Sequence, residues 1–447
     1  MERLLGRFDH DITFDPSWRF LILHGPNGVG KTRLLELLHY AFSGQHLQLA
    51  RLPFESARFD FDSGYSVEVH KDTDGRESLF DSTEGASSPS ASGTASKLNW
   101  KLTHPGEEPV RVEEDFRSLF EDRRSLIWLE RRYPITRVGP VSWRHDRTDE
   151  PLDIYDIIER YGGELDLELG SSIQPTDLES ALSAFEVHLI EAQRLLTVTR
   201  SNRRRFDSSE VPSQESTVVS YGEDLSRRLA RILAENSGVS QRLDRTFPDR
   251  LLRAESESKT EDAIRSQYIE QQSLRSRLAA ISVLSGDQEK LKLPERTLED
   301  WERKALSIYL EDAGEKLATF DSILRQLELM REIINRRFLF KRLEVSQESG
   351  FAFFDEESDA RIRLRDLSSG EQHELVLLYQ LLMHVGANSL VLIDEPEISL
   401  HVAWQNEFLD DLGEIAALNS VRFIIATHSP HIIGDHWDRT FELYRAS

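Results

Sequence analysis

Eight consecutive residues near the N-terminus have the composition of a phosphate-binding loop. They are Gly25, Pro26, Asn27, Gly28, Val29, Gly30, Lys31 and Thr32. The run fits the pattern G-x-x-x-x-G-K-[ST] and lies between an apolar strand-like segment and a predicted helix. Its glycines let the backbone turn N–H groups toward phosphates, and the start of the helix favours anions. We expect Lys31 to reach the β- and γ-phosphates of a nucleotide and the Thr32 hydroxyl to bind Mg²⁺.

Two adjacent carboxylates follow a second apolar segment, Leu390–Ile393. A buried strand that ends in Asp394 and Glu395 delivers both side chains to one edge of a parallel sheet, where nucleotide sites lie. Asp394 is expected to hold Mg²⁺, chiefly through water. Glu395 is expected to accept a proton from the attacking water or to orient it. A strand that merely ends in acidic loop residues is the alternative, and the phosphate-binding loop makes it the weaker one.

A serine-rich turn, LSSGEQ at 367–372, precedes the helix predicted at His373–Val385. By itself such a turn is an ordinary helix N-cap. Its position before the acidic strand end, however, resembles the signature motif of the ABC-ATPase family. The resemblance implies that Ser368, Ser369 and Gly370 of one ATPase head bind the γ-phosphate of ATP held by a second head. Ser369 stands where transporter signatures usually have glycine, as in the RecF and OLD branches.

Further segments follow in the order of the same family. The segment 397–401 resembles the D-loop, and His428 in Ala-Thr-His-Ser-Pro resembles the switch histidine that senses the γ-phosphate. Glu395 and His428 are therefore the predicted catalytic residues. Val187–Ile190 followed by a polar turn resembles the Q-loop strand, which makes Gln193 a candidate Mg²⁺ ligand. A surface loop is the alternative for Gln193.

The long stretch between Lys31 and Leu367 narrows the resemblance to the SMC, Rad50, RecF and OLD group, whose heads are split by a helical insertion. The chain has no cysteine, which excludes the zinc hook of Rad50. The insertion is too short for the arm of an SMC protein. Few residues follow His428, so we expect no appended TOPRIM or RNase domain. The segments 188–196 and 424–443 resemble the stand-alone ATPases of phage-defence operons, the PARIS type among them.

The predicted fold is α/β: a P-loop NTPase with an ABC-type head of mixed sheet, split by a helical, partly coiled-coil insertion. Apolar residues recur with heptad spacing on one helix face between Leu306 and Leu327, which suits a helical hairpin or a projecting coiled coil. The predicted division is 1–125 for the first part of the head, 126–184 for a linker or subdomain, 185–198 for the Q-loop strand, 199–337 for the insertion and 338–447 for the second part of the head.

Composition limits the possible partners and compartments. The 447 residues carry a formal net charge of −24, which argues against a protein that coats nucleic acid with its whole surface. No segment has the apolar length of a membrane span or the pattern of a secretory signal, so we expect a cytoplasmic protein without a membrane contact. Arginine clusters at 200–205 and 331–342, and Trp143 beside Arg144, are candidate DNA or base contacts, with ion pairs and structural packing as the alternatives.

These patterns predict an ATPase whose heads close around ATP as a homodimer or a higher homo-oligomer. The expected role is control of a separate effector protein, such as a TOPRIM-like nuclease, in anti-phage defence. The alternative is a RecF-like DNA-repair ATPase that clamps DNA. Both hypotheses require ATP and Mg²⁺.

Overall fold

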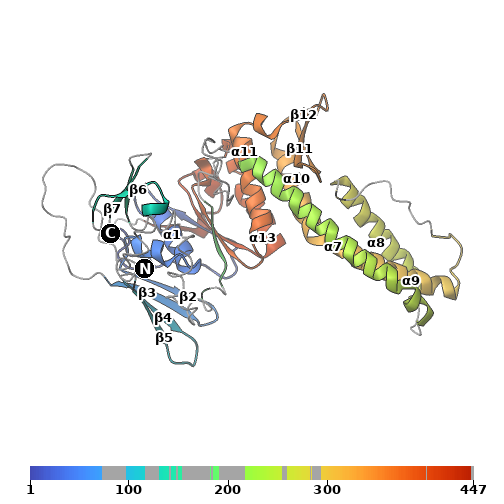
Figure 1. The fold of residues 1–447 in the computed structure, drawn as a ribbon, viewed down its shortest axis with the longest axis horizontal. Coiled ribbons are helices and arrows are strands. Elements are labelled where there is room, and N and C mark those ends of the chain that lie inside the picture. Colours follow the sequence, from blue (N-terminus) through green and yellow to red (C-terminus); the bar gives the residue numbers. More distant parts are fainter. Residues whose placement is uncertain are drawn as a thin grey trace. The chain divides into compact units, whose positions relative to one another are not determined.

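The computed structural model places the chain in two compact units, each described here by itself. The first unit contains residues 1–190, 388–396 and 421–447, and the second contains 191–387 and 397–420. The residues that the structure describes are 1–72, 97–115, 130–139, 142–146, 150–153, 182, 185–190, 217–253, 259–281, 283, 293–398 and 400–443. Figure 1 shows the arrangement of the elements within each unit.

A five-stranded parallel sheet forms the centre of the first unit. Its strands, in spatial order, are β15 (Thr440–Glu442), β1 (Phe20–His24), β14 (Arg422–Ala426), β13 (Leu390–Asp394) and β9 (Val187–Ile190). β1, β13 and β14 are nearly continuous apolar runs, as expected for parallel strands covered on both faces. The helix α1 (Lys31–Phe42) buries Leu34, Leu35 and Leu37 in the core of this unit.

The first unit also contains two antiparallel sheets and the short helices α2 (His46–Arg51) and α14 (Pro430–Ile433). One sheet is the meander β2 (Ser56–Asp60), β3 (Ser66–Asp72), β4 (Lys97–Thr103) and β5 (Val110–Asp115). In β4 every second residue is buried, namely Leu98, Trp100 and Leu102, which is the period of a strand with one face on the core. The other sheet contains β6 (Ile135–Arg137), β7 (Ser142–His145) and β8 (Pro151–Asp153).

Trp143 on β7 has a structural role. Its side chain is 1% exposed, and its indole N–H donates a 2.8 Å hydrogen bond to Glu130. The guanidinium carbon of Arg137 lies 5.4 Å from the ring centroid. The hypothesis that Trp143 stacks on a base is therefore wrong, because the ring is already enclosed.

The first residues of the chain do not form regular strands. They contain only isolated bridges, from Leu4 to Phe8 and from Glu2 to Ser56. Positive φ angles at Arg3, Leu5 and Gly6 turn the chain back on itself, which extended strands do not allow.

The described part of the insertion in the second unit consists of three long helices and a fourth that follows the third. They are α7 (Thr217–Arg253), α8 (Glu261–Ala280), α9 (Asp300–Ala318) and α10 (Asp321–Arg337). Contacts of Asn236 with Lys316 and of Arg250 with Asp312 show that α7 and α9 run antiparallel. Both α7 and α8 pack against α9 (Figure 1). The predicted helical insertion is therefore confirmed, and its described part is a bundle rather than a single hairpin.

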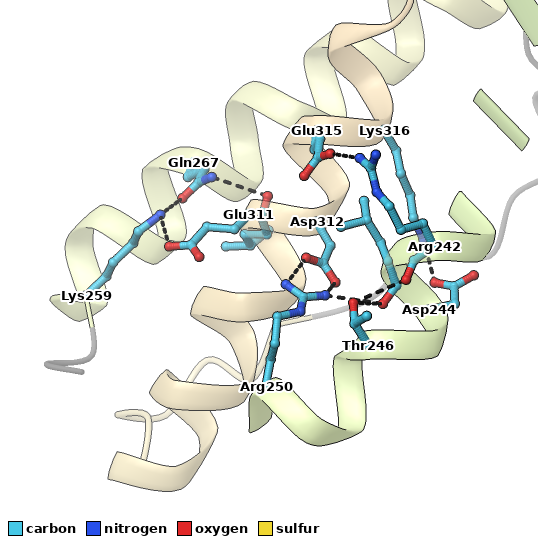
Figure 2. Close-up of polar contacts among 12 residues, drawn as sticks. Arg242, Asp244, Thr246, Arg250, Lys259, Gln267, Glu311, Asp312, Glu315 and Lys316 are labelled. Carbon is cyan, nitrogen blue, oxygen red and sulfur yellow. Dashed lines mark hydrogen bonds and ion pairs between the residues drawn. The ribbon is translucent and has the colours of Figure 1, made fainter. Parts of the chain in front are cut away.

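Charged side chains join the helices of this bundle (Figure 2). Arg250 near the end of α7 makes a bidentate pair with Asp312 of α9, at 2.5 and 2.6 Å. Its second nitrogen also donates to the Leu243 carbonyl at 3.2 Å. Pro248 lies inside this last part of α7 and supplies no backbone N–H, so the helix loses a bond there. In the same turn the Thr246 hydroxyl donates to the carbonyls of Arg242 and Leu243, at 3.2 and 3.1 Å.

The apolar stripe that predicted one continuous helix is divided between α9 and α10. The break lies at Thr319 and Phe320. The Thr319 hydroxyl and the Asn236 amide of α7 donate to the Lys316 carbonyl at 2.8 and 2.7 Å, which satisfies the end of α9. Phe320 is 1% exposed and keeps the apolar spacing across the break, so the pattern does not reveal it.

The remaining elements of the second unit surround a buried charge network. They are β10 (Lys341–Ser346), β11 (Gly350–Asp355), β12 (Arg361–Ile362), α11 (Ser369–Tyr379), a π-helical segment (Gln380–His384), α12 (Val402–Gln405) and α13 (Phe408–Asn419). Arg337 at the end of α10 is fully buried and pairs with Glu374 of α11 and Asp411 of α13. Removing either carboxylate would leave an uncompensated buried charge.

The described basic cluster at 331–342 is engaged within the protein. Arg336 pairs with Asp411, Lys341 with Glu371, and Arg342 with Glu344 and Asp359. The ion-pair alternative is therefore confirmed for these residues, whereas Arg331 of the same cluster donates to the Ala280 carbonyl at 2.8 Å. The cluster at 200–205 lies outside the described residues. Within the described residues, no helix combines the length and hydropathy needed to cross a membrane.

Candidate functional site

The register of the parallel sheet brings three loops to one edge. Leu23 of β1 and Asp394 of β13 both pair with Ala426 of β14. The phosphate-binding loop, Glu395 and the segment that carries His428 therefore all leave the sheet at its carboxyl edge. This is the edge where ligands bind in open parallel sheets.

The phosphate-binding loop has the backbone that its glycines predict. Gly28 and Gly30 have φ angles of +85° and +92°, which side chains with a Cβ rarely adopt. A Cβ at Gly30 would also lie 2.8 Å from Cδ2 of Leu4. Val29 is buried, whereas Pro26 and Asn27 are exposed at the bend. The loop is thus a fixed turn anchored on the core, with its outer side open.

Lys31 is buried at the start of α1, with an exposed fraction of 5%. Its ammonium group donates to the carbonyls of Gly25, at 3.0 Å, and Pro26, at 3.3 Å, and contacts Nε2 of His428. The loop and the end of β14 are therefore joined through one cation. An ammonium in this position is placed for an anion in the loop.

The Thr32 hydroxyl donates a 2.9 Å hydrogen bond to Oδ2 of Asp394. Asp394 is buried, and this burial is the main cause that raises its pKa to about 6. The negative charges of Glu395 and Glu36 raise the pKa further, whereas the Thr32 hydrogen bond and the Lys31 charge lower it. The other carboxylate oxygen, Oδ1, is buried and has no hydrogen-bond partner among the residues that the structure describes. A hydroxyl beside an orphaned carboxylate oxygen is a donor set that suits Mg²⁺.

Glu395 and His428 face each other at this edge. Nε2 of His428 lies 3.6 Å from Oε1 of Glu395, and both side chains are about one-third exposed, at 31%. Glu395 has a φ of +43°, an unusual conformation for a residue with a side chain, and its N–H donates to the Ala426 carbonyl at 2.8 Å. The strained backbone turns the Glu395 side chain out of the strand and toward the loop edge.

The segment 368–370 belongs to the second unit and begins α11. Ser368 is the N-cap: its hydroxyl accepts from the Glu371 N–H, and the Glu371 carboxylate accepts from the Ser368 N–H at 2.8 Å. The capping role is therefore present. Ser368 and Ser369 are exposed, and the turn lines a groove of about 830 Å³ together with Lys341 and Trp404.

Two further predicted segments have different outcomes. In the predicted D-loop, the His401 side chain accepts from the Ala403 N–H at 3.3 Å and caps the short helix α12. The predicted Q-loop strand is β9, with the predicted bounds Val187–Ile190, and its last residue pairs with Ile393. Gln193 itself lies outside the described residues.

Three features of the site were not predicted from sequence. One is the contact between Lys31 and His428, and another is the support of Gly30 by Leu4. The third is the left-handed backbone at Glu395, which has no sequence signal, since that conformation usually selects glycine or asparagine.

Comparison with known families supports a P-loop ATPase. Residues 223–434 match the family described as "AAA domain, putative AbiEii toxin, Type IV TA system". The match contains the segment 368–370, Asp394, Glu395 and His428, and the P-loop lies before it in the sequence. The match extends over just under half of the chain, so it shows what these residues are similar to. Together with the P-loop on the same sheet, the match indicates a P-loop ATPase.

A short stretch is similar to a phage protein. Over 67 residues the chain is 40% identical to protein ea59 of Escherichia phage lambda. The stretch covers 15% of this chain and 13% of ea59, so the chain matches only a small part of that protein.

Solved SMC head domains give extended but weak superpositions. They include the Smc head of Pyrococcus furiosus bound to the C-terminal domain of ScpA, with 13% identity and a TM-score of 0.27 over 92% of this chain and 84% of that one. A second SMC head bound to ScpA gives 11% identity and a TM-score of 0.29, over 92% and 82%. The SMC head of Thermotoga maritima has 11% sequence identity and a TM-score of 0.28, over 93% of this chain and 82% of that one.

Proposed function

We propose that this protein binds and hydrolyses ATP at the carboxyl edge of the parallel sheet. The observation that supports the proposal best is the convergence of Lys31, Thr32, Asp394, Glu395 and His428 from three strand ends. P-loop ATPases combine a phosphate cradle, a metal-binding hydroxyl and carboxylate, and a residue that positions the attacking water. Each of these parts has a matching side chain here.

The roles follow from the chemistry of each group. The P-loop N–H groups and Lys31 bind phosphate oxygens, and Thr32 with Asp394 would hold Mg²⁺, which neutralises phosphate charge when bound. Glu395 is the base: its carboxylate orients water and accepts a proton from it. His428 touches both Lys31 and Glu395 and is placed to donate to a terminal phosphate.

A second copy of the chain completes the site in this proposal. The exposed turn 368–370 of one copy contacts the γ-phosphate bound by the other, so ATP holds two heads together. The turn begins a helix and presents N–H groups, which favour an anion. Exposed apolar residues beside the turn, Leu339, Phe340 and Ile398, supply surface that a second copy can bury.

The biological role that we propose is control of a separate effector protein in anti-phage defence in the cytoplasm. The family description names a putative toxin and a toxin–antitoxin system, and this is the support for such a role. Head closure on ATP and opening after hydrolysis would give the effector two states to recognise.

Light scattering of active-site variants tests the proposal. Glu395→Gln keeps the shape of the side chain and removes the base, so ATP should stay bound and the closed homo-oligomer should accumulate. Ser368→Arg in the same background should abolish this closure, because a bulky side chain fills the space for the partner's γ-phosphate.

Ser368 also caps α11, so its loss alone costs about 1 kcal/mol of stability. Ser369→Arg keeps the cap and is the matched variant. If both arginine variants still close on ATP as Glu395→Gln alone does, the two-copy site is wrong.

A further inference from the structure

A second cavity of about 500 Å³ lies in the first unit, away from the nucleotide edge. Its floor is apolar and comes from the sheet and the far half of α1, with Leu21, Ile424, Leu37 and Phe42 among the lining residues. This volume is in the range of ligand-binding pockets. None of the residues assigned to ATP lines it.

The cavity runs along the edge of strand β2. Six consecutive residues, 57–62, line it. Because neighbouring residues of a strand point to opposite faces, a cavity lined by all of them lies beside the strand rather than over one face. β2 is an outer strand of its sheet (Figure 1). Among the described strands it pairs with β3, and on its other side the described residues add one bridge, from Ser56 to Glu2.

The outer edge of β2 is open beyond its first residue. The Glu55 carbonyl and the Phe61 N–H bond toward β3, to Lys71 and Tyr65, and the Ser56 carbonyl accepts from Glu2 on the other side. By the alternation of a strand, Arg58 and Asp60 present their N–H and C=O groups outward. Within the described residues, no further backbone bond covers these two positions.

Carboxylates surround this open edge. Asp11, Asp60, Asp62 and Glu186 line the cavity, and its described lining residues also include two cations, Arg58 and the N-terminal ammonium of Met1. That ammonium donates to the His10 carbonyl at 3.0 Å. Arg58 is already paired with Asp60, while Asp11 and Asp62 have no polar partner among the described residues. His10 also lines the cavity, and its Nε2 is buried without a hydrogen-bond partner. The rim therefore favours a cation next to an apolar group.

We propose that β2 and this cavity bind an extended segment of a partner protein by strand addition. The segment would bond to the outward groups of Arg58 and Asp60, place apolar side chains in the cavity at alternate positions, and carry Lys or Arg toward Asp11 and Asp62. Backbone bonds supply affinity in this recognition mode, and pockets for alternate side chains supply specificity. The inference goes beyond the ATPase proposal and does not depend on hydrolysis.

Fluorescence anisotropy with the full chain tests the inference. The probes are short labelled peptides in which Val or Leu alternates with Lys, with the same peptides carrying Glu in place of Lys as the control. Saturable binding of the basic peptides, at least about tenfold tighter than the acidic ones, is expected.

Three variants locate the site. Arg58→Pro removes the outward backbone N–H without breaking a bond to β3. Arg58→Ala removes the same side chain and keeps that N–H. Peptide binding by Arg58→Pro should therefore be about tenfold weaker than binding by Arg58→Ala. Asp62→Lys should weaken binding of the basic peptide and leave ATP binding unchanged. Circular dichroism and ATP binding confirm that the variants fold.

Three results would overturn the inference. They are the absence of saturable binding, equal binding of basic and acidic peptides, and equal binding by Arg58→Pro and Arg58→Ala. A fourth result would assign the cavity to a small molecule instead. In that case the protein would bind a small apolar dye but no peptide, and Arg58→Pro would not change the dye binding.

Discussion

The Thr32 hydroxyl donates a 2.9 Å hydrogen bond to Asp394 Oδ2, although 362 positions separate the two residues in sequence. The contact joins the helix that follows the P-loop to the end of β13, and it forms because β1 and β13 both pair with β14. Pairing within the parallel sheet therefore brings Thr32 and Asp394, the two proposed Mg²⁺ ligands, together despite the long stretch of chain between them.

Lys31→Ala should reduce ATP affinity by at least about tenfold, because a charge-assisted contact to phosphate is lost. Lys71→Ala is the matched control. Lys71 is also a partly buried lysine of the first unit, bonded to the Leu52 carbonyl rather than to the P-loop. Isothermal titration with ATP checks the pair. Equal affinity of Lys31→Ala and the wild type would show that the nucleotide site lies elsewhere.

His428→Ala should lower the ATP turnover number by about 10²-fold while ATP still binds, because one donor to the terminal phosphate is removed. His431→Ala serves as the control, since His431 is exposed three positions along and lies outside the cluster. Steady-state phosphate release measures both variants. Similar rates for the two would rule out a sensor role for His428.

Gly30→Ala should destabilise the protein more than Gly28→Ala. Both positions have positive φ, which costs a residue with a Cβ about 1–2 kcal/mol. At Gly30 the new methyl group also meets Leu4 at 2.8 Å, whereas no atom lies within 4 Å at Gly28. Urea denaturation of both variants measures the difference, and the reverse order would contradict the described packing of the loop.

Glu374→Ala should lower the free energy of unfolding by about 3–5 kcal/mol, because buried Arg337 loses a partner. Arg342→Ala should cost at most about 1 kcal/mol, since its pairs are exposed to solvent. Chemical denaturation compares the two. A cost below 1 kcal/mol for Glu374→Ala would mean that the charge network is not buried in solution.

Motifs with a fixed backbone requirement were predictable from sequence. The P-loop needs glycines at set positions between a strand and a helix, and β1 and α1 lie where this requirement places them. The apolar run before Asp394 has the length of a buried strand, which is what the structure contains. The fold class was therefore accessible without coordinates, and so was the shared sheet edge of Asp394, Glu395 and His428.

Features decided by partners distant in sequence were not predictable. The division between α9 and α10 depends on Asn236 of α7, and Phe320 conceals it by keeping the apolar spacing. The sequence of Trp143 and its neighbours allowed either base stacking or structural packing. Its contacts with Glu130 and Arg137 show that it is packed inside the protein. For the arginines at 331–342, the sequence was compatible with both DNA contacts and ion pairs, and only the positions of their carboxylate partners distinguish the two. Each case required tertiary contacts.

The ATP turnover of Glu395→Gln tests the proposed site most directly. The substitution removes the base, lies at a half-buried position and leaves Thr32, Asp394 and Lys31 in place. Asp438→Asn, at an exposed carboxylate of the same unit outside the cluster, is the control. Phosphate release and retention of labelled ATP are measured together. We predict a turnover at least about 10²-fold below that of the wild type, with ATP retained on the protein. Turnover at the wild-type rate would contradict the assignment of Glu395 as the catalytic base.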